Sequence, residues 1–347
     1  MSKCAYGDTL ERFVRVVRGR RRDEVMAAFI VDSPWLGGYG GGDTLDYYFD
    51  VDVWVEVQKK VADDLAGAAL VPGSWVEFGM AAEPSGWGVP IQWRHDSPPA
   101  IHHYPGDIDE LLKRGVPNPE VDGLMPAILR RYERAKRQLD AAGIGARMAA
   151  CRGPLATASH LTGLTEFLMA TQMTPDKCTA LLEKTTELCI AWLGAQLKRM
   201  DKPVGVLVLD DVVGMLSPAD GRTFALPYLR RIFEAFGNLI HIYHNDTPNA
   251  NMLEGLAGIG MDVFNFSHQI DVVKARELLG ADVVLMGNVP PLDVLVRGTH
   301  EDVRRETRAL LEKAGEAGPV LISAGGGISP GTPLENIKAM LDEVARG

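Results

Sequence analysis

The chain has 347 residues, of which 46% are hydrophobic and 24% charged, proportions that are ordinary for a soluble globular enzyme. Its formal net charge of -10 argues against a nucleic-acid-binding protein, because such proteins normally carry a basic face. No apolar run approaches the roughly 18 residues of a membrane span, and the N-terminus leads into a polar helix without a signal-peptide core. The four cysteines are scattered and form no CxxC pair, so we expect a reduced, cytoplasmic protein.

The N-terminal third, about residues 1–145, predicts an irregular start to the fold. In chain order the expected elements are a helix at 9–17, a strand at 25–31, a glycine-rich loop or lid at 37–42, a helix at 51–65, a β-hairpin at 89–93 and 100–104, and a long helix at 123–141. The strand at 25–31 fits the first strand of a barrel. We interpret the rest as an elaboration around it.

From residue 146 onward, strands and helices alternate regularly. The predicted strands are 147–151, 204–209, 239–243, 261–266, 282–286 and 320–323, and the helices are 157–171, 175–200, 220–236, 249–258, 271–279, 301–317 and 334–345. Repeated strand–helix units build a parallel sheet, and continuous apolar strands indicate a sheet covered on both faces. We therefore predict an α/β fold, a (β/α)₈ TIM barrel forming one domain over residues 1–347.

Polar residues recur where the predicted strands end. They are Asp32, Ser33, Cys151, Asp210, Asp211, His244, Asp246, Asn265, His268, Asn288 and Ser323. A TIM barrel gathers the C-terminal ends of its strands around one cavity, so the set predicts a site there. Tyr39 in the glycine-rich loop and Gly326 in the run Gly325–Gly327 are further candidates for substrate contact, since glycine lets a ligand approach the backbone. The alternative for each single residue is that loops are simply polar.

His244 and Asp246 are the most informative pair, because residues two apart on a strand point to the same side. They are candidates for metal ligands, and a His–Asp pair that binds substrate directly is the alternative. Of Asp210 and Asp211, only one is expected to face the cavity, and we favour Asp210 because it directly ends its strand. The other would cap a turn or helix. His241 is expected to be a satisfied buried histidine.

Several motifs resemble the uroporphyrinogen decarboxylase superfamily. They are residues 82–88 (AEPSGWG), 153–155 (GPL), 287–292 (GNVPPL), 298–303 (GTHEDV) and 333–340 (PLENIKAM). The resemblance covers about residue 80 to the end and implies a barrel with its cleft at the C-terminal face. Members that decarboxylate uroporphyrinogen carry arginines after the first strand, where this chain has Val31-Asp32-Ser33. An acidic residue there would repel a polyanionic substrate.

The other branch of the superfamily comprises corrinoid-linked methyltransferases, which hold zinc with a His-x-Cys pair and a later cysteine in a glycine-rich loop. His244 matches that histidine, Asp246 stands at the first cysteine position, and the later cysteine is absent from Gly325–Gly327. The resemblance therefore implies a harder site of imidazole and carboxylates, which suits an oxygen-bearing substrate.

We accordingly expect a methyltransferase that moves a methyl group from a small O- or N-methylated compound to a separate corrinoid protein. Asp210, Asp211, His244 and Asp246 would be catalytic, and His244 and Asp246 would hold zinc or another divalent metal. A cofactor-free decarboxylase or lyase acting on a different substrate is the alternative, and a binding protein that retains the barrel is a third. No nucleic-acid or membrane partner is expected. The sequence leaves open whether the protein forms a homodimer.

Overall fold

Eight parallel strands lie side by side in the computed structural model, which describes residues 5–19 and 24–346. Their order is β2-β1-β10-β9-β8-β7-β6-β5. The strands are β1 Met26–Ile30, β2 Ala68–Val71, β5 Met148–Arg152, β6 Gly205–Leu209, β7 Ile240–Asn245, β8 Val263–Phe266, β9 Val284–Val289 and β10 Val320–Ala324. Each strand is hydrogen-bonded to its neighbours in this order, and in the described residues the two end strands, β2 and β5, are not hydrogen-bonded to each other. The sheet is therefore a nearly closed TIM barrel, as predicted.

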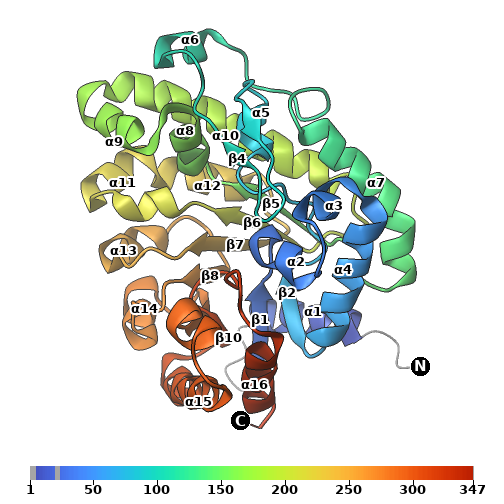
Figure 1. The fold of residues 1–347 in the computed structure, drawn as a ribbon. Helices are drawn as coiled ribbons and strands as arrows, with labels where there is room; N and C mark the ends of the chain where they lie inside the picture. Colours follow the sequence, from blue (N-terminus) through green and yellow to red (C-terminus); the bar gives the residue numbers. More distant parts are fainter. Residues whose placement is uncertain (1–4, 20–23, 347) are drawn as a thin grey trace.

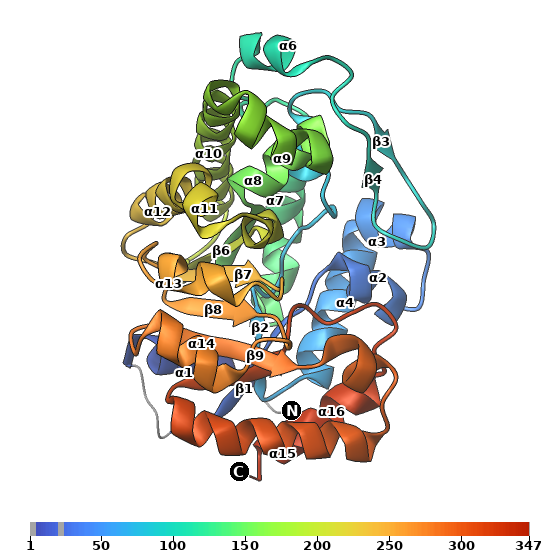
Figure 2. The same cartoon turned by 90° about the vertical axis from the view of Figure 1, so that its left-hand side faces the viewer.

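Helices surround the strands on the outside (Figures 1 and 2). The longer ones are α1 Ala5–Gly19, α4 Val51–Asp64, α7 Met125–Ala141, α9 Leu164–Met173, α10 Pro175–Leu197, α15 His300–Ala317 and α16 Leu334–Val344. The shorter ones are α2 Ser33–Tyr39, α3 Thr44–Phe49, α5 Ala82–Ser85, α6 Ile108–Lys113, α8 Pro154–Thr162, η1 Asp211–Met215, α11 Pro218–Phe224, α12 Leu226–Glu234, η2 Ala250–Met252, α13 Leu253–Leu256, α14 Val272–Leu279 and η3 Pro291–Val296. The predicted hairpin is present as β3 Ile91–Gln92 and β4 Ala100–Ile101. In the part of the chain that the structure describes, no helix is long and apolar enough to cross a membrane.

The barrel strands are buried on both faces, since side chains point alternately to the interior and to the surrounding helices. Every residue of β1, β5, β6, β7 and β10 is buried. This double burial explains why these strands read as continuous apolar runs in the sequence.

Three sequence predictions about the elements were wrong. The second barrel strand, β2, was not predicted, because only four residues separate Gly67 from Pro72. The predicted loop at 37–42 is partly helical, since α2 begins at Ser33 with a proline in its first turn and continues through two glycines. The helices predicted at 157–171 and 220–236 are each two helices. Gly163, with φ of 99°, separates α8 from α9, and Ala225 separates α11 from α12.

The strand register brings the functional candidates to one end of the barrel. Arg152 is paired with Leu209, Leu209 with His244, and His244 with Asn265 on successive strands. These residues therefore lie at one level at the C-terminal strand ends, which we call the barrel mouth. Catalytic residues of TIM barrels lie at this end.

Candidate metal centre

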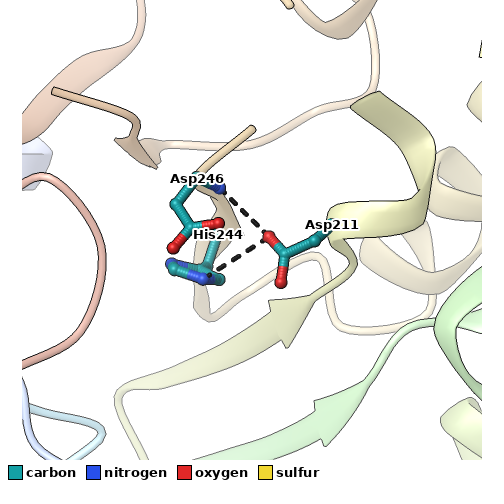
Figure 3. A group of neighbouring side chains, drawn as sticks. All are labelled: Asp211, His244 and Asp246. Atoms are coloured by element: carbon teal, nitrogen blue, oxygen red, sulfur yellow. Dashed lines mark hydrogen bonds and ion pairs between the residues drawn. The ribbon is translucent and has the colours of Figure 1, made fainter. Parts of the chain in front are cut away.

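Asp211, His244 and Asp246 form a cluster at the barrel mouth (Figure 3). Each offers one ligand atom, and the three atoms lie within 4.8 Å of one another. His244 is buried in β7, Asp246 directly follows that strand, and Asp211 begins η1 after the neighbouring strand β6. In Figure 3, the Asp211 carboxylate faces the other two side chains from across the gap between these strands. The predicted pair is thus brought together with a third acidic group.

The spacing within the cluster suits an ion better than a direct hydrogen bond. The backbone N–H of Asp246 donates to Oδ1 of Asp211 over 3.0 Å and holds that carboxylate in place. The same oxygen lies 3.6 Å from Nε2 of His244, which is too long for a hydrogen bond. Two ligand atoms on a tetrahedral zinc ion are about 3.4 Å apart, because each lies about 2 Å from the metal. The donor set of one imidazole and two carboxylates therefore fits a divalent ion.

Asn265 determines which nitrogen of His244 is available to a ligand. The Asn265 amide nitrogen donates to the carbonyl oxygens of Met286, over 2.9 Å, and Ala324, over 3.3 Å. Its amide oxygen must then face Nδ1 of His244, at 2.7 Å, and can only accept a hydrogen bond there. In the neutral imidazole the proton lies on Nδ1, and the lone pair of Nε2 lies on the side of Asp211. Metal-binding histidines are typically oriented by an acceptor that binds the N–H of the ring nitrogen not used for the metal.

The two adjacent aspartates have the opposite orientation to the one predicted. The buried Asp210 carboxylate accepts hydrogen bonds of 2.9 Å from the backbone N–H groups of Leu155 and Ala156, at the start of α8. Burial raises the pKa of Asp210, and these N–H groups oppose that shift. Asp211, not Asp210, lies beside His244. Strand alternation does not apply to this pair, because β6 ends at Leu209 and η1 begins at Asp211.

Asp246 lies at the exposed side of the cluster. Desolvation raises the pKa of its carboxyl, the charge of His244 lowers it, and the like charge of Asp211 raises it. The glycine run packs against this group. A Cβ on Gly326, where φ is 127°, would lie 2.9 Å from Oδ2 of Asp246. The missing side chain leaves the backbone close to the carboxylate, as expected for a glycine that permits close approach.

A second group of charges lies at the same end of the barrel and was not predicted. The buried guanidinium of Arg152 forms an ion pair with Glu77, whose other oxygen accepts the backbone N–H of Ser33 over 2.8 Å. Burial disfavours the charge of Arg152, but Glu77, Asp32 and Glu83 raise its pKa. Arg152 is the last residue of β5, one beyond the predicted strand end. The alternation of that strand could have indicated Arg152 instead of its neighbour Cys151.

Asp32 follows β1 and belongs to this group. Burial and the charge of Glu77 raise the pKa of Asp32 to about 7, while Arg152 and His244 lower it. Ser33 is buried, and its hydroxyl interacts with that of Tyr48. Both predicted residues therefore lie in the polar interior of the barrel mouth.

Other predicted residues make contacts away from the cluster. The Tyr39 hydroxyl donates to Asp64 at the end of α4, over 2.6 Å. Cys151 is fully buried, and its thiol contacts that of Cys189 in α10, so it faces the helix layer. His241 is the satisfied histidine that was predicted, with its ring nitrogens 2.7 Å and 3.1 Å from the carbonyl oxygens of Gly260 and Phe236.

Of the three remaining candidates, His268 follows β8, Asn288 lies in β9 and Ser323 lies in β10. His268 and Asn288 line a groove of about 290 Å³ together with residues of α14 and α15. The Asn288 amide donates to the carbonyl oxygens of Ser267 and Ile270, which is a structural role. Ser323 is fully buried, and its hydroxyl has no partner in the described part of the chain. In the described part of the chain, none of these three side chains forms a hydrogen bond with Asp211, His244 or Asp246. Their part in substrate binding stays a prediction.

Comparisons with known proteins agree with the fold. Residues 9–347 match the family described as uroporphyrinogen decarboxylase (URO-D). A uroporphyrinogen decarboxylase from Gloeobacter violaceus is 32% identical over 177 residues, about half of each protein (49% of this chain and 48% of the relative). One from Carboxydothermus hydrogenoformans is 26% identical over 266 residues, covering 75% of this chain and 74% of the relative.

Among solved structures, a methyltransferase from Methanosarcina mazei superimposes with a TM-score of 0.82 at 20% sequence identity. The superposition covers 96% of this chain and 97% of that protein, so the two share their fold over nearly the whole length. With the family match extending from residue 9 to the C-terminus, this chain belongs to the uroporphyrinogen decarboxylase (URO-D) family.

Proposed function

We propose that this protein is a methyltransferase that takes a methyl group from a small O- or N-methylated compound and passes it to a separate corrinoid protein. A divalent metal, with zinc as the first choice, would be held by Asp211, His244 and Asp246. The observation that supports this proposal best is the position of His244. Its Nε2 lies 3.6 Å from a carboxylate oxygen of Asp211, and Asn265 accepts the hydrogen bond from the other ring nitrogen. In its neutral form His244 presents the lone pair of Nε2 to this carboxylate, and a cation between the two atoms would satisfy both.

Asp211, His244 and Asp246 would supply three protein ligands, the number typical of catalytic zinc sites, whereas structural zinc sites typically have four. When bound there, the metal would supply Lewis-acid polarisation of the heteroatom that carries the methyl group. The protein's own part is to orient that ion. Asn265 orients His244, and the backbone N–H of Asp246 orients Asp211. Ligands of nitrogen and oxygen type favour an oxygen- or nitrogen-bearing donor over a thiol.

The charges at the barrel mouth also support this choice over uroporphyrinogen decarboxylation. Asp32, Glu77, Asp211 and Asp246 are acidic, and the positive charge of Arg152, which interacts with Asp32 and Asp211, is already paired with Glu77. An acidic mouth repels a substrate with many carboxylates. The similarity of fold to a methyltransferase from Methanosarcina mazei is compatible with the proposal.

A cofactor-free decarboxylase acting on another substrate is the second candidate. It is favoured by the names of the curated relatives and by Asp32, whose pKa near 7 would let it protonate a carbanion. The two candidates differ in whether activity needs a metal.

The test combines metal analysis with two histidine variants on one strand. The purified protein is expected to hold close to one equivalent of a divalent ion, and His244→Ala is expected to lose it. His241→Ala is the matched control, because His241 lies in the same strand but its two ring nitrogens lie against the carbonyl oxygens of Gly260 and Phe236. Retention of the ion by His244→Ala, or conversion of uroporphyrinogen by the metal-free wild type, would contradict the proposal. Methyl transfer from O- and N-methylated compounds to chemically reduced cobalamin is the activity assay.

A further inference from the structure

The carboxyl group of Asp32 takes part in no side-chain hydrogen bond or ion pair within the described part of the chain. Asp32 precedes α2, but its side chain accepts no hydrogen bond from that helix. In residues 5–19 and 24–346, the Asp32 carboxylate forms no ion pair and no hydrogen bond with another side chain. Asp32 is half-buried, and the fully buried acids around it all have hydrogen-bond or ion-pair partners. Asp210 caps α8, Glu77 binds Arg152, and Glu83 accepts the backbone N–H of Arg152 over 2.8 Å.

The glycine run relates Asp32 to the metal cluster. A Cβ on Gly327 would lie 4.0 Å from Oδ2 of Asp32, and one on its neighbour Gly326 would lie 2.9 Å from Oδ2 of Asp246. The two carboxylates, from the ends of β1 and β7, thus border the same short loop. The Nε of Arg152, which has no hydrogen-bond partner among the described residues, is buried nearby. A polar atom left without a protein partner in a buried region indicates that a ligand completes it.

We propose that Asp32 is the acid that protonates the leaving oxygen during methyl transfer, and that the methyl donor is an ether of an alcohol or phenol. This inference rests on the proposed function. In the step, the bond between the methyl carbon and oxygen breaks, and its electron pair stays on oxygen. The methyl carbon is taken by the reduced cobalt nucleophile of the acceptor protein. The proton of the Asp32 carboxyl moves to the oxygen, which leaves as a neutral alcohol or phenol. Asp32 is left as a carboxylate and recovers its proton from water.

The surroundings of Asp32 fit this role. Burial and the negative charge of Glu77 favour its protonated form, whereas Arg152 and His244 favour its ionised form. Its pKa of about 7 leaves much of the group protonated at neutral pH, when an ordinary aspartate is ionised. A proton donor matters for ethers because an alkoxide leaves poorly without one. A quaternary ammonium donor, in contrast, leaves as a neutral amine and needs no proton.

The experiment compares wild type with Asp32→Asn over a series of methyl ethers whose alcohols or phenols differ in acidity. Reduced cobalamin serves as the acceptor. We expect kcat in the variant to fall by about 100-fold or more for ethers of aliphatic alcohols and by less than about tenfold for a nitrophenyl ether. Asp32→Glu keeps the acid and should restore the wild-type dependence on the leaving group. Glu83→Gln, which removes a buried acid already bonded to the backbone, should show no such dependence.

Two results would overturn the role of Asp32 and leave methyl transfer intact. One is an equal loss of kcat for every ether in Asp32→Asn. The other is a raised KM for methylated ammonium donors only, with unchanged kcat, which would indicate charge pairing with a cation. Wild-type protein loaded with metal that demethylates no ether and no amine would overturn the proposed function and the role of Asp32 together.

Discussion

The adjacent carboxylates Asp210 and Asp211 should respond in opposite ways to the same substitution. Asp210→Asn is expected to lower the free energy of unfolding and leave metal binding nearly unchanged. Asp211→Asn is expected to weaken metal binding and leave stability nearly unchanged. The reason is that Asp210 accepts two backbone N–H groups of α8, whereas Asp211 faces His244.

The size of each effect follows from the contacts. An asparagine at position 210 offers one acceptor oxygen, so one of the two hydrogen bonds of 2.9 Å is lost and its N–H is left buried without a partner. Such a loss costs about 1–3 kcal/mol, which is the decrease in the free energy of unfolding that we expect. At position 211 a neutral amide replaces a charged ligand. Metal affinity should therefore fall by more than the roughly 10–100-fold that is typical when only a residue hydrogen-bonded to a ligand is lost.

Denaturant unfolding of the metal-free proteins measures the first effect, and competition with a chromophoric chelator measures the second. Metal-free protein is needed because a bound ion would itself stabilise the fold. Loss of metal from Asp210→Asn with unchanged stability would refute the reasoning, and so would equal destabilisation by both variants.

Three further variants test the surroundings of the cluster. Asn265→Ala should weaken metal binding about 10–100-fold in the chelator assay, because Nδ1 of His244 loses its acceptor; unchanged affinity would show that Asn265 does not orient the ring. Asp32→Asn should raise the free energy of unfolding of metal-free protein at pH 8 by about 1–3 kcal/mol. Because the folded state raises the pKa of Asp32 to about 7, wild-type stability falls as pH rises from about 4 to 7, and the gain should shrink toward pH 5. A gain that grows on acidification would contradict this sign. Gly153→Ala should cost about 1–3 kcal/mol in a thermal or denaturant melt, since its Cβ would lie 2.3 Å from Oδ2 of Asp210; wild-type stability would show that the cap can shift freely.

Local pattern was sufficient for much of the fold. Apolar runs and their spacing predicted β1 and β5–β10 of the barrel, and the helices α1, α4, α7, α10, α14, α15 and α16 within a few residues. The wrong predictions concern short elements and helices that a single residue interrupts. Gly163 divides one predicted helix, and β2 spans only four residues. Periodicity needs several turns or residues to be read, so short elements give little signal.

By itself, the sequence determined that the chain alternates strands with helices and that His244 and Asp246 share one side of a strand end, because both follow from local periodicity. Only the tertiary structure decided which partners join them. Asp211 reaches His244 because the chain leaves β6 before the adjacent aspartates, and Asp210 is taken by the N-terminus of α8. Asn265 and Arg152 lie at the level of His244 because of the register between strands far apart in the chain. Register and helix docking depend on long-range packing, which no local pattern contains.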